Sequence, residues 1–198
     1  MKRDVLAAVF VIIMMVSAPA RAEVVFTNDV VFFEVQGKTP AELYKSILSH
    51  SMQIDGKRTV ASITTKLTQS GKALEHGNSC RADKYKINLD FVIKRPQIAD
   101  EDALSPEDRK NWEQMYAFIR SHEELHRQIW LSCAHAMSDE VAAIEEATCR
   151  ELTKRTNLLW SQMISDCDRK QRSFDDEQTK MLLGQQFYID ALRGSSTQ

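Results

Sequence analysis

The chain contains 198 residues, of which 43% are hydrophobic and 27% are charged, and its 26 basic and 28 acidic residues give a formal net charge of −2. Because the charges nearly balance and no block of basic residues occurs, nucleic acid and anionic membrane surfaces are disfavoured as partners. The length suits one domain with its own hydrophobic core.

Residues 1–22 are predicted to be a cleavable signal peptide. A basic start at Lys2 is followed by an apolar run from Val5 to Val16 and by a small-x-small cleavage pattern that ends at Ala22. An apolar run of about 12 residues is too short to span a bilayer comfortably, which argues against an uncleaved anchor. We therefore expect cleavage after Ala22 and a periplasmic or secreted mature protein without a membrane segment.

The mature chain is predicted to form a single α+β domain over residues 23–193, with a disordered tail at 194–198. Its first part, residues 24–98, shows strand patterns with one short helix among them, which indicates a small antiparallel sheet. Its second part, residues 105–193, shows helical patterns only. This part is predicted to be a long antiparallel helical hairpin.

The first strands and the short helix have distinct local signals. Two hydrophobic runs, at 24–26 and 30–35, are separated by the polar turn-like segment Thr27-Asn28-Asp29, so a hairpin or a bent edge strand is expected. The pattern Thr39-Pro40-Ala41-Glu42 combines a capping threonine, a first-turn proline and a glutamate three residues after the cap. It predicts a helix that runs to about His50.

Two further strands are expected before the helical part. From Arg58 to Gln69 the apolar side chains share one parity, as in a half-buried strand. From Tyr85 the alternation of apolar and polar residues is cleaner, and it is predicted to end at Pro96, because proline cannot donate a hydrogen bond to a neighbouring strand. The stretch between them, 69–79, contains two glycines and is predicted to be a loop.

Two long helices are expected after Ser105. Ser105 and Pro106 supply a cap and a first-turn proline, and no other proline or glycine occurs before Gly184. A single helix of about 80 residues would be unusual, so a reversal is placed near residues 148–150. The apolar seam of the first helix follows a heptad that includes His122 and His126, so both histidines are expected to face the packing partner.

Four cysteines lie beyond the predicted signal peptide, and an even number in an exported chain indicates two disulfides. Cys133 and Cys167 lie on the seams of the two predicted helices, and pairing them gives a register that also places the reversal near residue 150. Cys80 and Cys149 would then form the second disulfide. Four cysteines allow three pairings in all.

The segment His122-Glu123-Glu124-Leu125-His126 carries the strongest chemical signal. Positions i and i+4 of a helix lie on one face, so both imidazoles can bind one ion at about 2.0–2.1 Å. Zinc suits neutral imidazoles and lowers the pKa of its bound water to about 7, and Glu123 is placed to act as the general base. This HExxH pattern predicts a zinc peptidase acting on peptide or protein substrates; the alternative is an exposed helix without metal.

A catalytic zinc usually has three protein ligands and one position for water. The cysteine register nominates the acidic run Asp175, Asp176 and Glu177 as the source of the third ligand, because it places Asp176 opposite Glu124. Glu177 lies nearer the apolar seam. The alternative for this run is a solvated acidic surface.

Several short motifs occur in a fixed order over most of the mature chain. They are Val35-x-Gly37-x-Thr39-x-x-x-Leu43, Cys80 before the strand that ends at Pro96, Trp112, His122-Glu123-x-x-His126 and Cys149-x-x-Leu152. In order and spacing the chain resembles the bacterial family DUF922 of predicted secreted zinc-dependent proteases. The resemblance implies an exported protein with a zinc-dependent peptidase activity.

A downstream motif of that family, Tyr-Asp-x-x-Thr-x-His-Gly, is only partly present. Asp176 and Thr179 match, whereas Asp175 stands at the tyrosine position, Met181 at the histidine position and Leu182 at the glycine position. If the family histidine is a metal ligand, this chain uses Asp176, or alternatively Glu177, in its place, or it is a degenerate member.

Two functional hypotheses follow. In the first, the protein is an exported zinc peptidase in which His122, His126 and Asp176 (alternatively Glu177) bind the metal and Glu123 is the general base. In the second, it is a non-catalytic periplasmic binding or envelope-scaffold protein with a degenerate metal site.

Overall fold

The computed structural model describes residues 22–51, 53–54 and 57–195. Apart from Ala22, the predicted signal peptide lies outside these residues, as do the last three residues of the predicted tail. The chain forms these elements in order: β1 Glu23–Val35, α1 Pro40–His50, β2 Gln53–Ile54, β3 Lys57–Arg58, β4 Ser62–His76, β5 Ser79–Ile98, the 3-10 turn Glu101–Ala103, α2 Pro106–Ala143, β6 Glu145–Glu146, α3 Cys149–Leu183 and α4 Gln186–Ser195.

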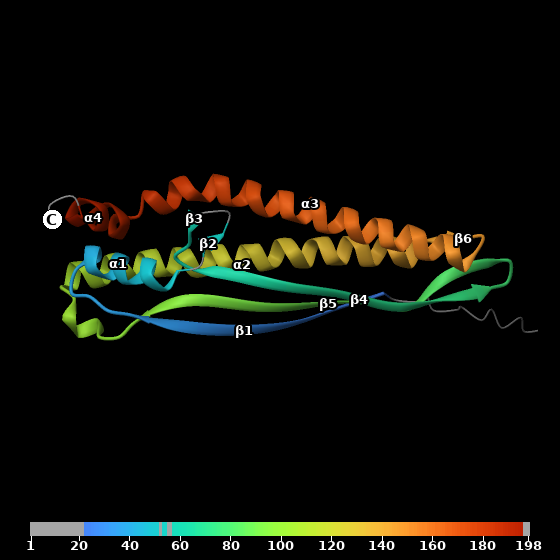
Figure 1. Cartoon of the computed structure of the whole chain (residues 1–198), viewed down its shortest axis with the longest axis horizontal. Helices are drawn as coiled ribbons and strands as arrows, with labels where there is room; N and C mark the ends of the chain where they lie inside the picture. The colour runs from blue at the N-terminus through green and yellow to red at the C-terminus, as the bar shows by residue number, and fades with distance from the viewer. Residues whose placement is uncertain (1–21, 52, 55–56, 196–198) are drawn as a thin grey trace, which may run out of the picture.

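The architecture is α+β, as predicted, and the molecule is elongated (Figure 1). Long strands run beside α2, and α3 lies along α2 on the side away from β1 (Figure 1). The predicted helical hairpin is therefore present as α2 and α3. Among the described residues, no helix is both long enough and apolar enough to cross a membrane.

The sheet is mixed, which corrects the expectation of a purely antiparallel sheet. β5 is its central strand and pairs with β4 in the antiparallel sense, with β1 in the parallel sense and with the short β6 at one end. β1 and β5 can run parallel because α1 and β4 both intervene, giving the chain the length that a parallel connection requires. Local strand patterns carry no information about that connection.

β1 is one continuous strand, so the predicted turn at residues 27–29 is wrong. The parallel register with β5 runs unbroken from Glu23 opposite Lys86 to Val35 opposite Ile98. The hydroxyl of Thr27 donates a hydrogen bond to Asp90 Oδ1 at 2.8 Å. The polar residues are tolerated within the strand because β1 is an edge strand whose side chains there are exposed to solvent.

β4 and β5 are longer than predicted, because the expected loop at 69–79 is mostly strand. A bulge at Gly71 lets β4 continue to His76, and the turn follows at Gly77, whose φ is 62°. A Cβ atom on Gly71 would lie 3.0 Å from Tyr85, so a close approach of the two strands explains this glycine. β5 also continues through Pro96, since β4 pairs no further than Lys94 and leaves β5 bonded there to β1 alone.

The predicted helix starts are confirmed. Thr39 Oγ1 accepts a hydrogen bond from the Glu42 amide at 3.3 Å at the start of α1, and Ser105 Oγ accepts one from the Asp108 amide at 3.1 Å at the start of α2. The reversal between the long helices lies slightly before the predicted position. It comprises β6 and ends at Thr148, whose Oγ1 caps α3.

The second long helix ends earlier than predicted. Gly184 caps the end of α3, and a separate helix, α4, begins at Gln186. α4 turns back against α1 and α2, and buries Phe187, Tyr188 and Ala191. α4 includes Gly194 and Ser195, the first two residues of the predicted tail.

Two apolar clusters form the core. One joins β5 to the second half of α2 and to α3, from Trp130 onward along α2. The other joins α1 and α4 to the first half of α2, as far as Ile119. The segment from His122 to His126 therefore lies between two apolar clusters.

Both predicted disulfides are present. Cys80 in β5 joins Cys149 at the start of α3, and Cys133 in α2 joins Cys167 in α3. The first ties the sheet to the helical reversal, and the second ties the two long helices to each other.

Replacing both Cys133 and Cys167 by serine is expected to lower the free energy of unfolding by about 2–4 kcal/mol, because the bond restricts the unfolded chain. Urea unfolding followed by circular dichroism would measure the change. The Cys80–Cys149 disulfide closes a loop of 69 residues, whereas Cys133–Cys167 closes one of 34. If loop closure dominates, removing Cys80–Cys149 should lower the free energy of unfolding at least as much. A Cys133/Cys167 variant as stable as the unsubstituted protein would contradict this expectation.

Candidate metal centre

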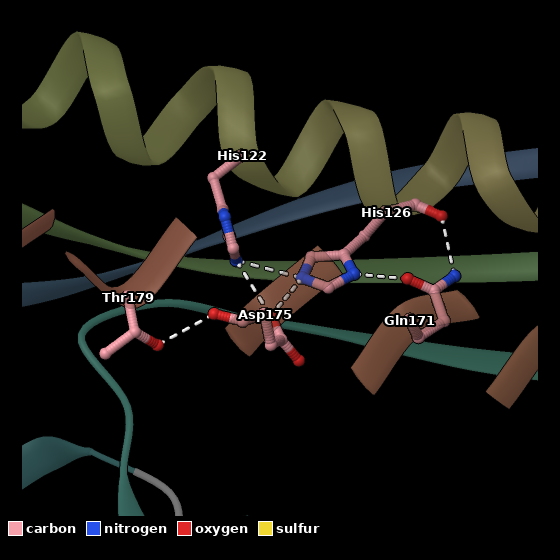
Figure 2. A network of polar contacts seen from close by, with 5 residues as sticks. All are labelled: His122, His126, Gln171, Asp175 and Thr179. Carbon is pink, nitrogen blue, oxygen red and sulfur yellow. Dashed lines mark hydrogen bonds and ion pairs between the residues drawn. The ribbon is translucent and has the colours of Figure 1, made fainter. Parts of the chain in front are cut away.

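Two imidazoles of α2 and one carboxylate of α3 converge where the long helices face each other (Figure 2). His126 Nε2 lies 2.9 Å from Asp175 Oδ1, and His122 Nε2 lies 3.2 Å from the same oxygen. The two Nε2 atoms are 2.9 Å apart. His122, His126 and Asp175 thus form a group that could hold a metal ion.

The donor set fits a divalent transition metal. Two imidazole nitrogens and one carboxylate oxygen are ligands that zinc and several other ions accept. A tetrahedral ion with bonds of about 2.0–2.1 Å spaces its ligand atoms about 3.3 Å apart, only a few tenths of an ångström more than the separations here. The Asp175 side chain is 52% exposed, so the group is open to solvent on that side.

Aromatic side chains set the planes of the two imidazole rings. His122 stacks between Phe118 and Phe174, with ring centroids 6.3 and 4.9 Å away. The His126 ring is nearly perpendicular to the same Phe174 ring, with ring centroids 4.9 Å apart and an interplanar angle of 88°. Phe174 therefore holds the two imidazoles nearly perpendicular to each other, with both Nε2 atoms on the same side.

Asp175 and His126 each change the pKa of the other. Partial burial would raise the pKa of Asp175, but hydrogen bonds from His122 and His126 outweigh it and hold that pKa well below its usual range. Burial would lower the pKa of His126, but hydrogen bonds with Asp175 and Gln171 raise it overall. Asp175 and His126 thus stabilise each other's charged forms, so a metal ion competes with a proton for His126.

Glu123 is buried beside this group without belonging to it. Glu123 is not among the three residues whose ligand atoms converge, and it is only 4% exposed. Burial raises the pKa of Glu123, although the charges of His122 and His126 oppose the shift. A carboxyl group with a raised pKa next to a possible metal site is suited to accepting and returning a proton.

The structure places Asp175 against the histidines, where the sequence had favoured Asp176 with Glu177 as the alternative. Asp176 and Glu177 are exposed, and neither belongs to the group. The cysteine register was right to within one residue, but one residue on a helix turns the side chain by about 100°. The spacing along α3 points to Asp175 more directly. Asp175 follows Cys167 by eight residues and Gln171 by four, so all three lie on the face of α3 that packs against α2.

Two further residues of α3, Gln171 and Met181, differ from what the sequence indicates. Gln171, which contacts His126, was not singled out, because a glutamine has no metal-binding signature of its own. Met181, at the position of the family histidine, is 55% exposed and lies six residues after Asp175, on another face of α3. A histidine there would not point into this group, so Met181 does not make the group incomplete.

Comparison with known proteins identifies one family. The family DUF922, described as a bacterial protein of unknown function, matches residues 30–181, a range that contains both histidines, Glu123 and Asp175. No curated protein and no solved structure matches the chain significantly.

The geometry predicts that Asp175→Asn weakens binding of a divalent metal ion by more than about 100-fold, because it removes the charged oxygen ligand. Asp176→Asn is the matched control, with the same chemical change one residue along α3, and it should leave affinity unchanged. Competition with a chromophoric chelator, using Zn²⁺ and Co²⁺, measures both. Equal losses in the two variants would contradict the placement of Asp175.

Glu123→Gln is expected to stabilise the metal-free protein at about pH 7. Because burial raises the pKa of Glu123 in the folded state, its ionised form is disfavoured there relative to the unfolded chain. Glutamine keeps the shape without the charge, so the variant should melt a few degrees higher. The difference should shrink as the pH falls through the ordinary pKa of glutamate, about 4.3, and should vanish at about pH 3, where Glu123 is protonated in both states. A variant that melts lower than the unsubstituted protein at neutral pH would contradict this assignment.

Proposed function

The chain belongs to the DUF922 family, and on that basis and the geometry of its possible metal group we propose that it is an exported zinc-dependent peptidase. His122, His126 and Asp175 bind the metal in this proposal, and Glu123 is the general base. The observation that carries it is the position of a buried carboxyl group, Glu123, beside a His-His-Asp group that is open to solvent on one side.

A zinc ion in this group would polarise a peptide carbonyl and lower the pKa of a water molecule beside it. Glu123 takes the proton of that attacking water and later gives a proton to the leaving amine. Burial raises the pKa of Glu123 toward neutral pH. A carboxyl group with such a pKa can both accept the proton of the water and donate a proton to the amine. Phe118 and Phe174 hold the imidazoles in place during these steps, so the ligands need little reorganisation.

Export is part of the same proposal. Two disulfides fit an oxidising compartment such as the periplasm or the extracellular medium, and the predicted signal peptide would direct the chain there. We infer a peptide or protein substrate, with no nucleic-acid partner and no membrane attachment after cleavage, because the charges are balanced.

A second candidate function has a specific observation in its favour. Asp175 and the two histidines lie within hydrogen-bonding distance of one another, so the group can also act as a polar cross-link between α2 and α3. In that case the protein is a non-catalytic periplasmic binding or scaffold module. The two candidates differ in whether zinc is retained and in whether Glu123 is needed for hydrolysis.

The peptidase proposal predicts that Glu123→Gln abolishes hydrolysis of an unstructured protein substrate, by about 1,000-fold or more, while zinc remains bound. Glu124→Gln is the matched control on the same helix. Glu124 is paired with Arg127 and does not belong to the metal group, so this variant should keep its activity. Zinc content by elemental analysis and hydrolysis of a fluorescent casein derivative provide the two measurements.

Stoichiometric zinc with activity lost only in Glu123→Gln would support the peptidase. An unsubstituted protein that retains no zinc and cleaves no peptide would favour the scaffold instead. Equal loss of activity in both glutamate variants would show that Glu123 has no special role.

A further inference from the structure

We propose that Gln171 is a positioning residue that fixes the tautomer of His126 and so presents Nε2 of that ring to the metal ion; the metal part of this inference rests on the proposed function. Gln171 lies on α3, one helical turn before Asp175, and is partly buried. The two α3 residues contact opposite nitrogens of the same imidazole (Figure 2).

Two hydrogen bonds fix the orientation of the Gln171 amide. Its Nε2 donates to the backbone carbonyl oxygen of His126 at 2.9 Å, and its Oε1 contacts Nδ1 of the His126 ring. A carbonyl oxygen can only accept, so the NH₂ group must face the backbone and Oε1 must face the ring. Rotating the amide by half a turn would set oxygen against oxygen.

The fixed amide in turn decides which ring nitrogen carries hydrogen. Because Gln171 Oε1 can only accept, Nδ1 of His126 must donate, and the neutral ring is the Nδ1–H tautomer. The lone pair of the neutral ring is then on Nε2, which faces His122 Nε2 and Asp175 Oδ1 at 2.9 Å each. A lone pair directed at a carboxylate is unfavourable unless a proton or a metal ion lies between them, so a metal ion bound here takes the place of a proton on Nε2.

His122 shows by contrast what Gln171 adds. Within the described part of the chain, Nδ1 of His122 is buried without a hydrogen-bond partner. Stacking against Phe118 and Phe174 fixes the plane of its ring but does not select a tautomer. Of the two histidines, His126 is therefore the one for which the protein selects the tautomer before a metal ion binds.

Such outer partners of a metal-binding histidine typically change metal affinity 10- to 100-fold. Gln171→Met removes both hydrogen bonds at nearly constant length and should weaken Zn²⁺ binding by about that factor. Gln171→Glu keeps an acceptor for Nδ1–H but loses the donor to the His126 carbonyl, so it should bind Zn²⁺ more tightly than Gln171→Met and less tightly than the unsubstituted protein. Gln162→Met makes the same change at an exposed position of α3 and should have no effect.

The second measurement needs no metal and no activity. Long-range ¹H–¹⁵N spectra of the metal-free, histidine-labelled Asp175→Ala variant report the tautomer of each ring at about pH 9, well above the ordinary pKa of imidazole. Asp175→Ala is the background because the Asp175 carboxylate, 2.9 Å from Nε2 of His126, would itself attract a proton to that nitrogen. In this background His126, assigned through His126→Ala, should be the Nδ1–H form both with Gln171 and with Gln171→Glu. With Gln171→Met it should shift toward the Nε2–H form.

The inference is overturned if Gln171→Met leaves the tautomer of His126 unchanged in the Asp175→Ala background, or if Gln171→Met in the otherwise unsubstituted protein does not lower Zn²⁺ affinity. Affinity lost without a change of tautomer would indicate packing alone and would also overturn it. An unsubstituted protein that binds no Zn²⁺ would reject the proposed metal site and the role of Gln171 in metal binding. The metal-free spectra distinguish that outcome, because they test the hydrogen bond to His126 separately.

Discussion

The two long helices pack in one antiparallel register, and the Cys133–Cys167 disulfide holds that register close to the candidate metal centre. Cys133 follows His126 by seven residues on α2, and Cys167 precedes Asp175 by eight on α3, so about two helical turns separate bond and site on each helix. A slip of one turn would move Asp175 by about 5.4 Å and separate it from both histidines. The contacts of Gln171 and Phe174 depend on the same register.

The candidate metal group lies between two apolar clusters, and this position determines the ionisation of its side chains. The clusters exclude water from Glu123 and largely from His126, so the charged forms of these side chains must be stabilised by neighbours. Asp175 supplies the compensating charge from the more exposed side. Ionisable groups with shifted pKa values that lie together in this way are common at functional sites, which supports the proposed role of this group.

Much of the fold could be predicted because local signals were strong. The capping residues Thr39 and Ser105 determined where α1 and α2 begin, and the apolar seams of the helices placed Cys133 opposite Cys167. The pairing of β1 with β5 could not be predicted, because parallel and antiparallel neighbours impose the same alternation on a strand. Nor did a local signal reveal that α4 would leave the line of α3 and fold back on α1, since that choice depends on burying Phe187 and Tyr188.

The sequence by itself determined the α+β class, the hairpin of long helices and the two histidines with Glu123 between them, because helix caps and i, i+4 spacing act within one or two turns. Only the tertiary structure decided that Asp175 rather than Asp176 meets those histidines and that Gln171 contacts the far nitrogen of His126. The physical reason is the geometry of helix packing. Each residue turns a side chain by about 100°, so a ligand on a second helix is fixed only when the rotation and register of both helices are known.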